Sequence, residues 1–89
     1  MTVFEYLQEE YPELLIADGF NDALLGVAHR CGQPTIAIYD RRQCIEILMA
    51  QGMDEEEAEE FFSFNTEGAW MGPETPAFLA RPDLGENGN

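Results

Sequence analysis

The chain has 89 residues, with 18 acidic side chains, four arginines and no lysine, and its formal net charge is −14. A 45% hydrophobic fraction is too high for a disordered acidic tail, so we expect one small domain with its own core. The negative charge disfavours direct binding to nucleic acid or to anionic membranes. The sequence has no apolar run of about 20 residues and no signal-peptide pattern. Its two cysteines form no disulfide framework, so we expect a reduced protein of the cytoplasm.

The first predicted element is a helix that begins after Thr2, because Thr2 and Glu5 have the spacing of a capping box. Its apolar side is formed by residues at helical spacing, which are Val3, Phe4, Leu7, Tyr11, Leu14 and Leu15. Its other side is acidic and carries Glu5, Glu9, Glu10 and Glu13. We expect Pro12 to bend this helix or start a second turn, and Asp18-Gly19 to stop it.

Two short strands follow, over 23–29 and 35–39, and the loop between them predicts an antiparallel hairpin. A second helix is expected to begin at Asp40 and to end at Gly52, since Asp40 is a good N-cap and glycine a good C-cap. Its buried stripe is predicted to consist of Cys44, Ile45, Ile47 and Leu48.

A third helix is predicted from the capping pair Asp54 and Glu57, with an inward side made of Ala58, Phe61, Phe62 and Asn65. Beyond it we expect a turn at 66–68, a short extended piece at 69–71 and an edge strand over 76–80. Residues 1–80 would form the domain, and 81–89 a frayed C-terminal tail.

These elements predict an α+β fold in the order α-β-β-α-α-β, with a small antiparallel sheet of two to three strands and helices packed on one face. The predicted core comprises Phe4, Leu7, Ile36, Ile38, Ile45, Leu48, Phe61 and Phe62.

The third helix carries the candidate functional surface. Glu55, Glu56, Glu59 and Glu60 are expected on one of its sides, with successive turns about 5.4 Å apart, which is of the same order as the roughly 3.4 Å rise per phosphate along a DNA strand. Together with the acidic side of the first helix, this row could occupy a DNA-binding groove as a decoy. The alternatives are adaptation to high salt and charge that only solubilises the protein.

Other chemistry finds little support in the residues. His29 and Cys31, with Asp22 or Asp40, superficially resemble a cysteine nucleophile site, but the negative field raises a thiol pKa and no hydrolase spacing is present. One histidine and two cysteines do not supply a zinc site, and the segment 18–22 lacks the spacing of a calcium loop. We therefore expect no catalytic residue, metal or cofactor.

The aromatic residues leave a second kind of surface open. Trp70, Phe61, Phe62 and Phe64 are more than one helix face can bury, so one or two of them are expected to contact a partner or a second copy of the chain as a homodimer.

Several short blocks between Asp18 and Leu79 resemble a family of small, largely uncharacterised proteins encoded by tailed bacteriophages. The blocks are Asp18-Gly19-Phe20-Asn21-Asp22-Ala23, Arg30-Cys31-Gly32-Gln33-Pro34, Ala37-Ile38-Tyr39-Asp40, Cys44-Ile45-Glu46-Ile47-Leu48-Met49 and Phe64-Asn65-Thr66-Glu67-Gly68-Ala69-Trp70. The resemblance implies an origin and no particular activity, although small phage proteins are often host-takeover factors that inhibit a host enzyme.

The acidic surface and the resemblance together favour a non-enzymatic phage protein that inhibits a host DNA-handling protein by mimicking DNA. The partner would have a basic groove, as in a restriction enzyme, a CRISPR effector, a nucleoid protein, gyrase or RNA polymerase. The alternatives are an interaction or structural module that uses its aromatic residues and, more remotely, a cysteine-dependent enzyme.

Overall fold

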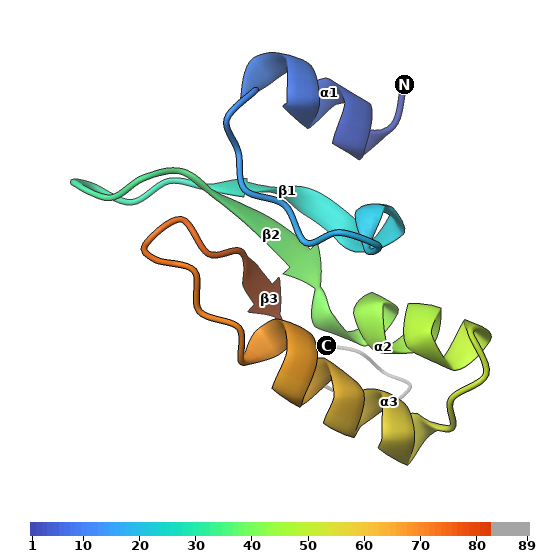
Figure 1. The fold of residues 1–89 in the computed structure, drawn as a ribbon. Coiled ribbons are helices and arrows are strands. Elements are labelled where there is room, and N and C mark those ends of the chain that lie inside the picture. Colours follow the sequence, from blue (N-terminus) through green and yellow to red (C-terminus); the bar gives the residue numbers. More distant parts are fainter. Residues whose placement is uncertain (83–89) are drawn as a thin grey trace.

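The computed structural model describes residues 1–82. It has a mixed three-stranded sheet, with one helix at one end of the molecule and a pair of helices at the other end (Figure 1). The α-helices of these residues are α1 (Val3–Glu10), α2 (Arg41–Ala50) and α3 (Glu55–Phe62). The strands are β1 (Leu24–Ala28), β2 (Ile36–Asp40) and β3 (Ala77–Leu79). Two further short helices, η1 (Asn21–Ala23) and η2 (Ser63–Glu67), precede β1 and continue α3. The predicted α+β class and element order are confirmed.

All three α-helices begin at the caps that the sequence predicts. Thr2 and Glu5 form a complete capping box, in which the Thr2 amide donates to Glu5 Oε1 at 3.0 Å. Asp54 and Glu57 do the same for α3, where the Glu57 amide donates to Asp54 Oδ1 at 2.8 Å. These side chains satisfy backbone donors that have no partner inside the helix, so they fix where each helix starts.

The first helix is shorter than expected. It ends at Glu10 and does not continue towards Asp18, because Pro12 lacks the amide hydrogen that an interior helical position must donate and disfavours helical geometry in the residue before it. The chain then runs as an irregular segment to Phe20. The Ala17 amide in this segment donates to the buried Tyr39 hydroxyl at 2.7 Å, which fastens the segment to β2.

The predicted hairpin is present, since β1 and β2 pair antiparallel, with an irregular register between Leu24 and Gly26. The third strand is an edge strand, as predicted. It lies next to β2 and pairs with it in parallel, so the expectation of a wholly antiparallel sheet is wrong. Helices α2 and α3 connect β2 to β3. A long crossover of this kind allows the second strand to run parallel to the first, whereas a tight turn can join only antiparallel strands. Residues 69–71 form no strand.

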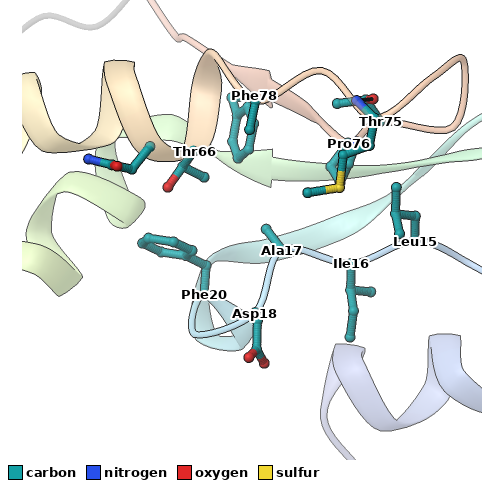
Figure 2. Close-up of a pocket in the computed structure, with 12 residues that line it drawn as sticks. Leu15, Ile16, Ala17, Asp18, Phe20, Thr66, Thr75, Pro76 and Phe78 are labelled. Carbon is teal, nitrogen blue, oxygen red and sulfur yellow. Dashed lines mark hydrogen bonds between the residues drawn. The ribbon is translucent and has the colours of Figure 1, made fainter.

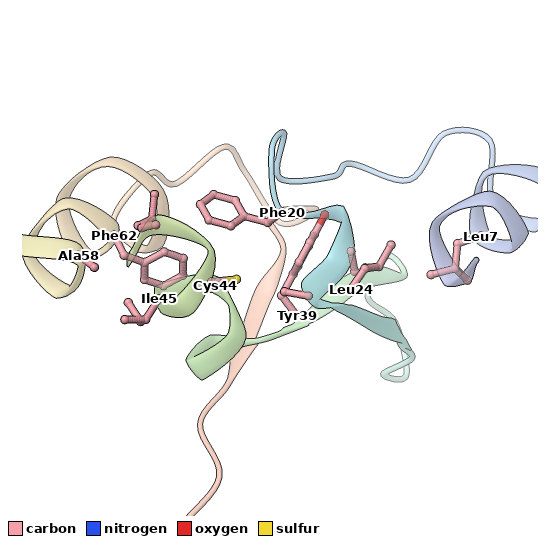
Figure 3. Packing of buried hydrophobic residues seen from close by; sticks show 11 residues of the cluster. Leu7, Phe20, Leu24, Tyr39, Cys44, Ile45, Ala58 and Phe62 are labelled. Atoms are coloured by element: carbon pink, nitrogen blue, oxygen red, sulfur yellow. The ribbon is translucent and has the colours of Figure 1, made fainter. Parts of the chain in front are cut away.

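The core lies on one face of the sheet and joins all three α-helices (Figure 3). Leu24, Ala37 and Tyr39 from the strands pack in one cluster with residues from each helix, which are Leu7, Cys44, Ile45, Leu48, Ala58 and Phe62. Ile36 and Ile38, predicted as core, alternate with Ala37 and Tyr39 and are only partly buried on the opposite face. A strand of four consecutive apolar residues, 36–39, carries no polar alternation to show which face turns inward.

Helix α3 also buries fewer residues than predicted. Ala58 and Phe62 are fully buried, whereas Phe61 is 43% exposed and Asn65 is exposed. Ala58 and Phe62 are four residues apart and share one helix face, so Phe61 falls on its flank. Phe4 is partly buried, while Leu7, Ile45, Leu48 and Phe62 are buried as expected.

The turn predicted at 66–68 is replaced by η2, a π-helical turn that extends α3 to Glu67. Gly68 follows it, and a Cβ atom there would lie 2.7 Å from the Ser63 carbonyl oxygen, so glycine permits this close approach of the backbone. Most of the tail expected at 81–89 lies outside the described residues. Arg81, at its start, donates to the buried carboxylate of Asp40 at 2.7 Å.

Truncation of the buried helix residue Leu48 to alanine should lower the free energy of unfolding by about 2–5 kcal/mol, because the cavity left in the core loses both burial and packing. Leu25→Ala is the matched control, since the Leu25 side chain is 41% exposed and should lose less than about 1 kcal/mol. Urea denaturation of both variants gives the comparison, and equal losses would contradict the described core.

Candidate functional site

The predicted acidic row of α3 is divided into two by arginines of α2. Arg42 Nη1 lies 2.8 Å from Glu55 Oε2, and Arg41 Nη2 lies 3.0 Å from Glu59 Oε1. Glu55 and Glu59 are one turn apart on the side of α3 that faces α2, so an arginine neutralises each of them.

Glu56 and Glu60 form the second row, on the side of α3 that points away from α2. Both are exposed, and neither makes an ion pair within residues 1–82. Glu57 is exposed beside them, but one of its carboxylate oxygens accepts the Asp54 amide at 3.1 Å in the capping box. The uncompensated negative charge of α3 therefore lies on its outward side, which is the side that a partner could reach.

The acidic residues of the first helix do not join this surface. Glu9, Glu10 and Glu13 are exposed on or just after α1, and Glu5 is engaged in its capping box. Helix α1 packs beside β1, at the opposite end of the molecule from α3 (Figure 1). The acidic side of the first helix, expected to act together with the row on α3, thus forms a separate acidic surface.

Arg41 ties together three segments around the acidic helix. Its guanidinium donates to Glu67 of η2 at 2.9 Å and to Glu59 of α3 at 3.0 Å, and it lies 5.4 Å from the centre of the Phe62 ring. The hydrogen bonds to Glu67 and then to Glu59 raise the pKa of Arg41 above its usual value. Its partners accept from a planar fork of donors, a geometry that a lysine ammonium cannot reproduce.

An apolar hollow lies directly beside the outward acidic row. It has a volume of about 520 Å³ and is lined by Met53, Phe61, Phe64 and Asn65 together with Glu57 and Glu60. Phe64 is 83% exposed and Phe61 43%, so their rings form an apolar surface that contacts solvent. The sequence indicates that some of these aromatics are exposed, but the part played by Met53 depends on how the loop after α2 returns towards α3.

A second hollow, of about 280 Å³, opens between the segment before η1, the η2 turn and the strand β3 (Figure 2). Phe20, Ala17 and Phe78 line it, and Thr75 lies at its edge. The Thr75 hydroxyl accepts the Met71 amide at 2.7 Å and donates to the Gly72 carbonyl at 2.6 Å. This hydroxyl is already engaged in shaping the loop, and the other polar side chains among the lining residues are Asp18, Asn65 and Thr66.

Trp70 lies outside both hollows. Its side chain is 76% exposed, and that of the neighbouring Met71 is 66% exposed. Of the four aromatics singled out in the sequence, Phe62 is therefore core, and Trp70, Phe61 and Phe64 reach solvent.

The two cysteines have different environments. Cys31 is exposed in the hairpin loop, and Cys44 is fully buried in α2, where burial and the negative charge of Asp40 raise the pKa of the thiol to about 12. The ring of His29 lies against Thr35, with Nδ1 3.2 Å from Thr35 Oγ1, and stacks at a tilt near Tyr11. Residues 1–82 contain no group of three or more histidine, cysteine or acidic side chains placed to hold a metal ion.

Comparison of the chain with protein-family models, with curated proteins and with solved structures gives no match. Within residues 1–82, no helix has the length and apolar character needed to cross a membrane. What the protein does must therefore be inferred from its own surface chemistry.

Replacing Arg41 with methionine should lower the free energy of unfolding by about 1–2 kcal/mol, because two partly buried ion pairs and a contact with the Phe62 ring are lost together. Arg42→Met is the matched control, and its ion pairs, whose side chains are all more than half exposed, should give a clearly smaller effect. Thermal unfolding at low salt measures both. If Arg42→Met lowered the free energy of unfolding more than Arg41→Met, Arg41 would not be the main ion-pair contact between α2 and α3.

Alkaline pH should destabilise the protein through Cys44. Its folded-state pKa of about 12 exceeds the ordinary value of 9.0, so the protonated thiol contributes stability below pH 9 that is lost as the pH rises towards 12. Urea denaturation between pH 8 and about pH 11 should show this decline. Cys44→Ala should reduce the decline, and the part that remains would come from Tyr39, whose pKa burial also raises. Alanine at the exposed Cys31 is the control substitution.

Proposed function

We propose that this protein is a non-enzymatic, phage-encoded inhibitor that binds a basic surface of a host DNA-handling protein through the outward side of α3 and competes there with DNA. The observation that carries the proposal is the position of Glu56 and Glu60, which are exposed on α3 and have no arginine partner within the described residues.

The electrostatics of the whole chain support a basic partner. A net charge of −14 on 89 residues repels nucleic acid and attracts cationic protein surfaces, and it accelerates encounter with them at low salt. The arginines Arg41 and Arg42 are occupied by glutamates, so they leave this attraction largely intact on the outward side of α3.

The dimensions of α3 limit what it can imitate. Its eight residues extend about 12 Å, which corresponds to roughly three phosphates of one DNA strand. The proposed mimicry therefore replaces a short stretch of backbone in a groove, and the distant acidic side of α1 would add to it only through the long-range field.

Little in the structure favours chemistry over binding. A catalytic thiol must be available as a thiolate beside an activating base. The candidate nucleophile Cys31 is exposed in the hairpin loop, and no hydrogen bond joins it to His29 within residues 1–82. His29 lies against Thr35 and Tyr11, which gives its ring a structural environment.

A second candidate function, an interaction module that binds through aromatic side chains, is favoured by the exposed Trp70. A tryptophan with 76% exposure at the surface of a small domain is a frequent anchor of protein interfaces. In this alternative the acidic residues would only keep the protein soluble.

The central experiment is displacement of bacterial proteins from immobilised DNA. Wild-type protein, applied to DNA-cellulose loaded with host extract, should release a specific DNA-binding protein at low salt. The double variant Glu56→Gln/Glu60→Gln should need at least about tenfold more protein, because it removes the uncompensated charges of α3.

The matched control is Glu9→Gln/Glu10→Gln, which makes the same change in net charge at the opposite end of the molecule and should release the protein as wild type does. Equal activity of the α3 double variant and wild type would overturn the proposal. If only Trp70→Ala lost activity, the aromatic module would be the better description. A wild-type protein that folds only at molar salt would indicate salt adaptation.

A further inference from the structure

The hollow beside α3 leaves aromatic side chains exposed to water. Phe64 is 83% exposed, and Phe61 and the partly buried Met53 line the same hollow. A small protein rarely keeps adjacent aromatic side chains exposed without a partner, because each would gain free energy by leaving water.

The backbone holds these rings at the surface. Phe62 takes the core position, where it packs edge-on against Phe20 and Phe78. The Asn65 side-chain amide donates to the Phe61 carbonyl at 3.1 Å, across the turn that bears Phe64. The hollow is therefore a consequence of how α3 continues into η2, and it is present before any partner binds.

The acidic side chains at the rim of the hollow indicate which charge its occupant should carry. Glu57 and Glu60 line it together with the aromatic rings, so an apolar group that enters must be flanked by positive charge to be favoured. We propose that this hollow binds an apolar side chain of a basic, amphipathic segment of the partner protein, with lysines or arginines on either side of that side chain paired with the carboxylates. The inference rests on the proposed function and names the part of the basic partner that docks.

Charge decides between this occupant and the others that an apolar hollow could take. A second copy of the chain would bring carboxylates against carboxylates, since the formal net charge is −14. An anionic membrane surface would be repelled in the same way. A cationic protein segment is the one occupant that satisfies both the rings and the rim.

Two synthetic helical peptides of equal length and charge separate the apolar contribution from the charge. One is an amphipathic peptide of leucine and lysine, and the other has every leucine replaced by glutamine. We expect wild-type protein to bind the leucine peptide at least about tenfold more tightly, as measured by fluorescence anisotropy at fixed salt, because only leucine can fill the hollow.

Phe64→Ala should remove most of this preference and leave binding of the glutamine peptide unchanged. Tyr6→Ala is the matched control, because Tyr6 is an aromatic residue of α1 with 51% exposure at the other end of the molecule, and it should behave as wild type. Amide chemical-shift changes on adding the leucine peptide should gather at residues 57–65.

Equal affinity of the two peptides for wild-type protein, or equal effects of Phe64→Ala and Tyr6→Ala, would overturn the inference while leaving the charge-based function intact. Peptide binding that is insensitive to Glu56→Gln/Glu60→Gln would count against the proposed function and also against the pairing of the Glu60 carboxylate that this inference includes. A concentration-dependent dimer that Phe64→Ala dissociates would assign the hollow to a second copy and also overturn the inference.

Discussion

The attachment of α3 to α2 through Arg41 is the interaction on which the arrangement of this surface depends. The helix Glu55–Phe62 carries five glutamates, and like charges on successive turns oppose helix formation. Arg41 offsets this repulsion by pairing with Glu59 and with Glu67, and its position over Phe62 brings charge and core into contact. The buried pair of Ala58 and Phe62 then holds the helix against the rest of the protein.

Because of this attachment, the glutamates of α3 differ in their pairing according to the side of the helix on which they lie. Carboxylates that face α2 are neutralised, and those that face outward are not, so the negative surface is concentrated on one side of a short helix. The same side bears the hollow lined by Phe61 and Phe64. Charge that attracts a partner from a distance and apolar area that binds it at contact are thereby combined on one face, as in many protein interfaces.

The sheet supports this face without contributing to it. Tyr39 occupies the centre of the core, contacts the Phe78 ring of β3 and accepts the Ala17 amide, so a central strand residue joins the edge strand and the irregular segment after α1. The crossover through α2 and α3 returns the chain to β3 beside β2. The parallel pairing of β3 with β2 therefore fixes the end of the connection that contains α3 and η2.

The sequence by itself determined the helix starts, the hairpin and the excess of acid, because caps, turns and composition act over a few residues. It did not determine that Pro12 ends α1 outright, that β3 pairs in parallel, or that Ala37 and Tyr39 rather than Ile36 and Ile38 face the core. Only the tertiary structure separated the glutamates of α3 into paired and unpaired rows and moved those of α1 away. Ion pairing and strand direction depend on contacts between segments distant in sequence, which local spacing does not encode.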